Sequence, residues 1–255
     1  MSVHAIDPSA LQTLSAIPSS DRVLQVLVCI ARAGQSIAAR EIAAQTGIPL
    51  STVYRQLAPL KKWGLVQEHA QSGLYEPGPL AMQLAWGFDH HSYLMAEARP
   101  EIEQLVQRSG ESVGLLVHVN GQVICLDMQE SQQALRCSFT KGSANSLLRG
   151  ASAKALLAYL PEPVQEAQMT PLAEHEREIL QAQLAQIRQQ GYAVTENEID
   201  EGVWGVSVPI FSHKDKLEAS LSLMAPVSRA QQRHADYIQM TIAAAARIGQ
   251  KLRYN

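Results

Sequence analysis

The chain has 255 residues, of which 46 % are hydrophobic and 18 % charged, and its formal net charge is −3. These values predict one large folded domain or two of ordinary size, and they argue against a disordered chain. They also exclude a protein whose whole surface binds polyanions, although a small basic region could exist within that average.

The sequence contains no signal for export or membrane insertion. No apolar run reaches the roughly 18 residues of a membrane-spanning helix. The first 20 residues lack the basic and continuous apolar parts of a signal peptide. We therefore expect a cytoplasmic protein without a membrane partner.

Residues 1–19 are expected to form a flexible arm, and residues 20–79 a small domain with a winged helix-turn-helix layout. Helical periodicity continues to about Trp63, and then short alternating segments flank "AQSG", as in a β-hairpin. Residues 21–76 contain six basic and four acidic residues, a balance opposite in sign to that of the whole chain.

The segment "GIPLSTVYRQL" has the spacing of the second helix of a helix-turn-helix. Ala43, Gly47 and Val53 occupy the positions that need a small residue, a turn glycine and an inward apolar residue. Hydroxyl, amide and guanidinium groups on the outward face could bond phosphates or base edges. The alternative is a capped surface helix with solvated polar groups. The DNA-contacting residues predicted in this domain are Arg40, Ser51, Thr52, Tyr54, Arg55, Gln56 and Lys61.

Residues 80–98 predict a linker helix, and residues 99–255 a second, α+β domain. Asn120-Gly121 lies between alternating apolar segments and favours a hairpin. Further strands are expected at "QALRCSFTK", "YAVTENE", "GVWGVSVPIF" and "LEASLSLMA", with a last helix from about Arg229 to Leu252. This pattern predicts a mostly antiparallel sheet with helices beside it.

An enzyme is the competing interpretation, and it would require an activated cysteine thiolate near a base. Cys29, Cys125 and Cys137 lie far apart in apolar segments, which predicts buried thiols in a reducing compartment. The histidines show no metal-ligand spacing, and no phosphate loop or nucleophile elbow is present. We expect no catalytic residues, no metal and no cofactor.

Several segments, in order, resemble the IclR (isocitrate lyase regulator) family of bacterial transcription regulators. They are "EIAAQTGIPLSTVYRQLAPLKKWGLV", "ARPEIEQLVQRSGESVGLLV", "GASAKALLAYLP", "IRQQGYAVTENEIDEGVWGVSVPIF" and "ASLSLMAPVSR". The resemblance covers residues 21–250. It implies a two-domain α+β protein: an N-terminal winged helix-turn-helix, a helical linker and a C-terminal GAF-like α/β effector-binding domain. It also implies a homodimer or homotetramer that binds double-stranded operator DNA.

The resemblance further implies a small-molecule effector, often a carboxylate or an aromatic metabolite. Backbone N–H groups at the start of a loop-to-helix segment would meet its carboxylate, and strand residues would surround it. Arg149 could pair with the same carboxylate. The implied effector-binding positions are Arg149, Ala151, Ser152, Thr195, Trp204, Gly205, Ser222 and Met224.

This sequence departs from the family pattern at several of these positions. Gly205 stands where cysteine is frequent, Met224 where serine is usual, and Trp204 where arginine is common. These departures predict a larger and more apolar pocket, and so an aromatic or otherwise bulky acid. Ordinary core packing is the alternative for Trp204 and Met224, and a solvated loop charge is the alternative for Arg149.

The expected function is that of a transcription regulator, a repressor of a catabolic operon, whose operator affinity a small organic acid controls. A transcriptional activator of the same type is one alternative. A ligand-binding protein whose winged helix has lost DNA binding is the other.

Overall fold

The computed structural model describes residues 19–253, apart from the side chains of Ser19 and Lys214, and divides into two compact units at His90/His91. The predicted flexible arm of residues 1–19 lies outside the described residues except for Ser19, which begins the first described helix. Among residues 19–253, no helix combines the length and apolar composition needed to cross a bilayer.

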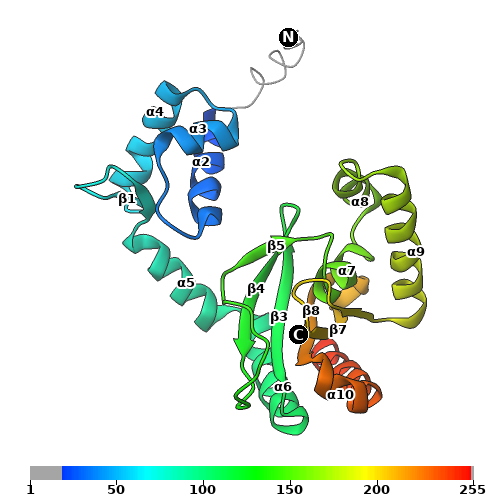
Figure 1. The fold of residues 1–255 in the computed structure, drawn as a ribbon. Helices are drawn as coiled ribbons and strands as arrows, with labels where there is room; N and C mark the ends of the chain where they lie inside the picture. Colours follow the sequence, from blue (N-terminus) through cyan, green and yellow to red (C-terminus); the bar gives the residue numbers. More distant parts are fainter. Residues whose placement is uncertain (1–18, 254–255) are drawn as a thin grey trace. The chain divides into compact units, whose positions relative to one another are not determined.

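The first unit contains three helices followed by a two-stranded hairpin (Figure 1). Its helices are α2 (Ser19–Ala33), α3 (Ala39–Thr46) and α4 (Leu50–Lys62), and its strands are β1 (Val66–Glu68) and β2 (Tyr75–Pro77). The strands pair antiparallel, with Val66 opposite Pro77. Gly47 ends α3 at a φ of 69°, a left-handed conformation that glycine adopts without a steric cost. The expected small core forms, because Ile42, Ile48 and Leu57 are all buried together.

Two helices connect this hairpin to the second unit's sheet. Helix α5 (Pro79–His91) has no buried residue. Helix α6 (Tyr93–Ser109) begins after Ser92, whose hydroxyl accepts a hydrogen bond from the Met95 N–H at 3.4 Å. The single linker helix expected over residues 80–98 is therefore two helices that meet at Ser92.

The second unit is built on a six-stranded sheet in which every neighbouring pair is antiparallel. The spatial order is β5-β4-β3-β8-β7-β6. The strands are β3 (Ser112–Val119), β4 (Gln122–Gln129), β5 (Ala144–Ser146), β6 (Ala193–Glu196), β7 (Val203–Phe211) and β8 (Leu217–Pro226). The strand expected at "QALRCSFTK" is wrong, because residues 133–141 form a loop and β5 begins after it.

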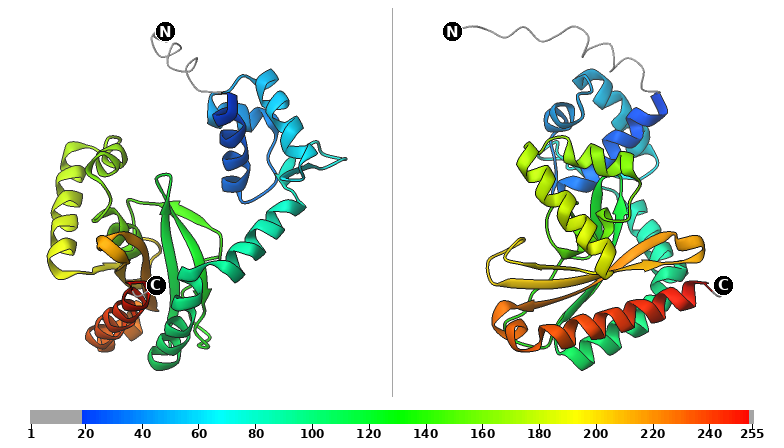
Figure 2. Two further views of the ribbon diagram at one scale, coloured as in Figure 1. Left: turned by 180° about the vertical axis from the view of Figure 1, so that it is seen from behind. Right: turned by 90° about the vertical axis from the view of Figure 1, so that its right-hand side faces the viewer.

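Helices cover both faces of this sheet. On one face α6 and α10 (Val227–Arg253) lie side by side, as Figure 2 shows, and pack on the apolar side chains of β3, β7 and β8. On the other face lie α7 (Ala151–Leu157), α8 (Glu162–Met169) and α9 (Glu174–Gln190). The predicted α+β architecture is confirmed.

Candidate DNA-reading helix and effector cavity

Helix α4 presents only part of its predicted DNA-contacting set to solvent. Ser51, Tyr54 and Arg55 are exposed and Thr52 is half-buried, whereas the Gln56 side chain is only 6 % exposed. Gln56 follows Val53 by three residues and precedes Leu60 by four, so it belongs to the inward stripe of the helix. The prediction that Gln56 contacts DNA from the side of the helix is therefore wrong.

The two other predicted DNA contacts are Arg40 and Lys61. Arg40 is exposed at the start of α3. The Lys61 ammonium lies 2.5 Å from the Glu68 carboxylate of the hairpin. This contact lowers the pKa of Glu68 and offsets the Lys61 charge. Lys62, next along the exposed end of α4, lies over the Trp63 ring.

In the second unit, residues of one face of the sheet meet the start of α7 around a small cavity. Six of the eight predicted effector positions line it: Ala151, Ser152, Thr195, Gly205, Ser222 and Met224. Strand register explains their meeting, because Thr195 pairs with Gly205 and Gly205 with Met224, so the three lie in one row across β6, β7 and β8. Four chain segments thus converge on one site.

Trp204 does not belong to this site. Successive side chains of a strand point to opposite faces, so Trp204 cannot share the face of Gly205. It packs in the core beneath α10, where its ring centroid lies 6.0 Å from that of Tyr237. The alternative of ordinary core packing is therefore correct for Trp204.

Arg149 also lies outside the cavity. Its side chain is exposed, and its guanidinium donates a hydrogen bond to the backbone carbonyl of Glu198. The cavity lining contains no charged side chain. Three hydroxyl groups, those of Ser152, Thr195 and Ser222, provide its polar side-chain atoms. The Ser222 hydroxyl is already paired, because its oxygen lies 2.7 Å from that of the buried Ser207.

The cavity is smaller than the sequence predicted. Its volume is about 20 Å³, which holds roughly one water molecule. The Met224 side chain, on the strand position paired with Gly205, lines the cavity and lies close to the face of this glycine. A Cβ built on Gly205 would stand 3.9 Å from the Met224 Cγ. The lining is mostly apolar, as expected, but the pocket is not enlarged.

Six lining residues were missed from the sequence: Phe139, Gly150, Ile199, Val203, Val206 and Leu223. Val203 could have been found, because it precedes Gly205 by two residues on the same strand and so shares its face. Phe139 and Ile199 lie in loops, where no periodicity indicates which way a side chain points.

The cysteines show no sign of catalytic activation. Burial raises the pKa of the Cys125 thiol to about 11 and also raises that of Cys137. A raised pKa keeps the sulfur protonated at neutral pH and so weakens it as a nucleophile. Within the described part of the chain, His, Cys, Asp and Glu side chains form no group of three that could hold a metal ion.

Substitution by alanine should affect protein stability at one glycine of the site and not at the other. A Cβ on Gly205 meets nothing closer than 3.8 Å, whereas a Cβ on Gly150 would lie 2.7 Å from the Ile199 Cδ1. Gly150 also has a φ of 88° and a ψ of 158°, a region essentially restricted to glycine. We predict that Gly150→Ala lowers the free energy of unfolding by about 2 kcal/mol, and that Gly205→Ala changes it by less than about 0.5 kcal/mol.

Urea unfolding, followed by circular dichroism, measures both differences. Equal stability of the two variants would contradict the assigned tight contact between Gly150 and Ile199.

Comparison with known proteins agrees with this architecture. Residues 19–70 match the model of the IclR helix-turn-helix domain, and residues 89–250 match that of the bacterial transcriptional regulator IclR C-terminal domain. The regulator BhcR of Paracoccus denitrificans is 28 % identical, and the alignment covers 91 % of this chain and 85 % of that protein. The transcriptional repressor IclR of Escherichia coli is 27 % identical, with 91 % and 89 % covered.

Solved structures share the fold. An IclR family transcriptional regulator from Brucella abortus superposes with a TM-score of 0.79 at 22 % identity, covering 92 % of each chain. An IclR homologue from Microbacterium hydrocarbonoxydans, solved in complex with 4-hydroxybenzoate, gives 0.70 at 22 % identity, covering 93 % of this chain and 100 % of that one. The matched models and relatives are regulators, not enzymes. The chain therefore belongs to the IclR family of DNA-binding transcription regulators.

Proposed function

We propose that this protein represses transcription from an operator that it binds through α4, and that a small organic acid in the second unit controls this affinity. The observation that carries the proposal is the convergence of six implied effector positions on one cavity. Repression is favoured because relatives of similar length are named repressors. The protein would act in the cytoplasm, where its operator DNA lies.

An aromatic acid is the proposed effector class. The cavity lining is apolar except for three hydroxyl groups, a composition that suits a ring carrying few polar substituents. A related regulator of the same fold was solved with 4-hydroxybenzoate bound. The acid would have to displace side chains, because the cavity itself holds only about 20 Å³.

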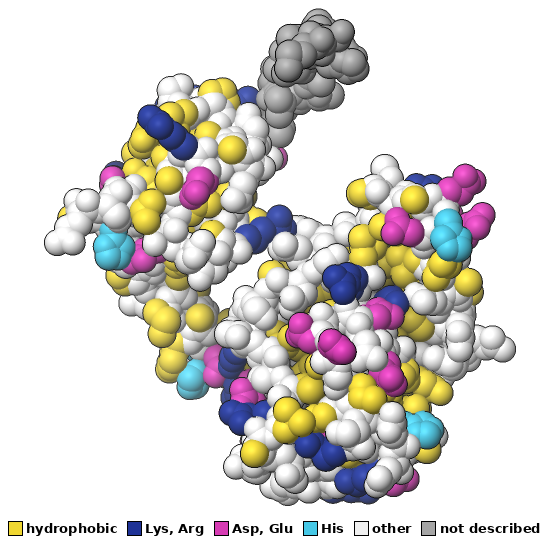
Figure 3. All heavy atoms as spheres, in the orientation of Figure 1, with side chains coloured by type: hydrophobic (Ala, Val, Ile, Leu, Met, Phe, Trp, Pro, Cys, Tyr) yellow, Lys and Arg dark blue, Asp and Glu magenta, His cyan; other side chains and the backbone are white. Residues whose placement is uncertain are grey.

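A homo-oligomer is proposed from the apolar surface of α5. Met82, Leu84, Trp86 and Phe88 are between 49 and 74 % exposed on this helix, and Figure 3 shows hydrophobic side chains gathered there. Met82 and Trp86 lie one turn apart on one side of the helix, and Leu84 and Phe88 on the other. Exposed apolar surface of this extent usually marks a protein interface. Two copies joined through α5 would place two reading helices on a roughly palindromic site. Both a dimer and a tetramer are compatible with this surface.

Arg55 should determine which sequence is read. A bidentate contact from arginine to guanine contributes about 1–3 kcal/mol of discrimination, so Arg55→Ala should lose about tenfold or more in affinity for the preferred duplex. Lys62→Ala is the matched control, since loss of one phosphate contact weakens all sequences alike and lowers the salt slope by about one.

Fluorescence anisotropy measures the affinity of each protein for two duplexes. One is a duplex that the wild-type protein selects from a random library, and the other is its scrambled version. If Arg55→Ala keeps the wild-type preference, α4 is not the reading helix.

Met224 should contribute to binding of aromatic acids. In a thermal-shift assay with pyruvate, benzoate and 4-hydroxybenzoate, the melting temperature of the protein should rise most with an aromatic acid. A ligand that binds only the native state stabilises that state. Met224→Ser should weaken that binding by about tenfold, since a buried ring loses apolar contact.

Met240→Ser is the control, because Met240 packs on the opposite face of the sheet and its loss should leave ligand affinity unchanged. A shift with pyruvate alone, or equal affinity of Met224→Ser and wild type by calorimetry, would contradict the aromatic class.

A further inference from the structure

The cavity is separated from a much larger recess by a thin wall of side chains. The recess has a volume of about 480 Å³ and is lined by residues 135–139, by the turn over residues 199–203 and by the end of β8. Four residues line both spaces and so form the wall between them: Phe139, Ile199, Val203 and Met224. The effector cavity would become part of a ligand-sized site of several hundred Å³ only if this wall moved.

One side of the wall is held by a charge pair in the core. Arg229 makes two hydrogen bonds, of 2.6 and 2.7 Å, to the Glu111 carboxylate, which is only 2 % exposed. The same guanidinium donates to the Leu135 carbonyl at 2.9 Å. Glu130 accepts further hydrogen bonds from Arg136 and Ser138. The segment before Phe139 is therefore tied at several points.

The other side of the wall is a compact turn, Asn197–Gly202, between β6 and β7. Two short-range hydrogen bonds close the turn. The Gly202 N–H donates to the Asn197 side chain at 2.7 Å, and the Asn197 N–H donates to the Val203 carbonyl at 2.8 Å. Asn197 and Gly202 both have positive φ values, 59° and 81°. Outside the turn, the Val227 N–H donates to the Gly202 carbonyl at 2.8 Å, next to β7, and Arg149 donates to the Glu198 carbonyl. The internal bonds keep the turn's own shape, so it can move as a unit when its contacts with α7 and Arg149 break.

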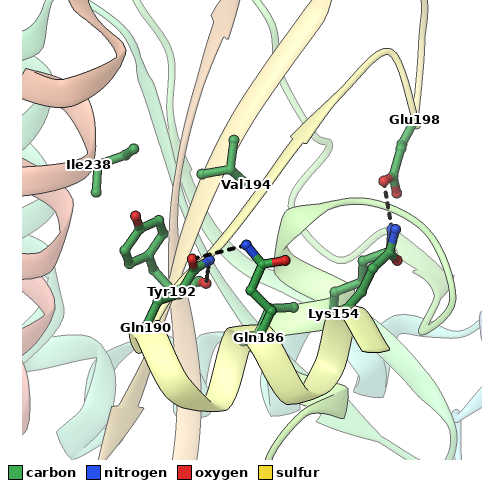
Figure 4. A pocket seen from close by; sticks show the side chains of 9 residues that line it. Lys154, Gln186, Gln190, Tyr192, Val194, Glu198 and Ile238 are labelled. Atoms are coloured by element: carbon green, nitrogen blue, oxygen red, sulfur yellow. Dashed lines mark hydrogen bonds and ion pairs between the residues drawn. The ribbon is translucent and has the colours of Figure 1, made fainter. Parts of the chain in front are cut away.

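Glu198 provides most of the polar contacts that hold the turn to α7. Its carboxylate accepts a hydrogen bond from the Gly150 N–H at 3.0 Å and pairs with the Lys154 ammonium at 2.6 Å. Figure 4 shows Lys154 reaching from its helix to Glu198. Lys154 is buried, so water competes weakly for this pair. With the turn docked, Ile199 lies against Gly150, whose missing side chain makes the close contact possible.

We propose that the turn Asn197–Gly202 is a gate latched by Glu198, and that opening it withdraws Ile199 and joins cavity and recess into one ligand site. The inference rests on the proposed function, because it explains how a cavity for one water molecule admits an aromatic acid. The latch sets the fraction of molecules in which the gate is open. The apparent affinity for the acid is the affinity of the open form multiplied by this fraction.

Hydrogen–deuterium exchange tests the latch without a ligand. In Glu198→Gln, the amides of residues 197–203 should exchange at least about fivefold faster than in wild type, because the turn opens more often. Glu201→Gln removes the same charge from an exposed position of the same turn and should leave exchange unchanged. Lys154→Met breaks the latch from the other side and should reproduce the effect. Equal exchange rates in all four proteins would overturn the proposal.

Titration with 4-hydroxybenzoate tests the gate. Glu198→Gln should bind it about tenfold more tightly than wild type or Glu201→Gln, because less of the binding energy is spent on opening. If wild type binds and Glu198→Gln binds equally or more weakly, Glu198 only supports the structure and the gate is wrong. If exchange accelerates but no variant binds aromatic acids, the latch stands and the proposed effector class is wrong.

Discussion

Two-residue alternation along β7 and β8 is the constraint on which the second unit depends. It sends large apolar side chains to the face covered by α6 and α10, and it sends glycine, serine and methionine to the face covered by α7. The first face is a packed core. The second face has small or polar side chains at Gly205, Ser207 and Ser222, which allows α7 to approach closely and leaves a cavity there.

The same constraint explains why the cavity is nearly closed. Gly205 and Met224 are direct cross-strand partners, so the long, flexible methionine side chain lies beside the glycine in the cavity lining. A methionine can change rotamer at little cost, whereas the backbone beneath it is fixed by the sheet. The site therefore combines a rigid sheet backbone with side chains that can change rotamer. Under our proposal, the turn Asn197–Gly202, which Glu198 holds in place, is the part of the lining that moves. A ligand can control DNA affinity only through a difference in how well it binds two arrangements of the protein.

Periodicity and turn residues were enough to predict both units, the hairpin after α4 and the antiparallel sheet. One mistake, the strand expected at "QALRCSFTK", came from reading a strand pattern into a loop. The others arose where periodicity was not applied or does not exist. Gln56 falls on the inward stripe of α4, and Trp204 and Gly205 cannot share a strand face; both could have been recognised from spacing alone. The contacts of Glu198, Ile199 and Phe139 could not, because they join loops that are distant in sequence and depend on tertiary packing.

The coupling between acid and DNA is the central claim, and reciprocal titration tests it most directly. Affinity for a duplex selected by the protein would be measured with and without saturating 4-hydroxybenzoate, and affinity for 4-hydroxybenzoate with and without that duplex. We predict that each ligand changes the affinity for the other by the same factor, in the range of about 5 to 150. Tight binding of both ligands with a factor of one in each direction would contradict the account, because the cavity would then have no influence on DNA binding.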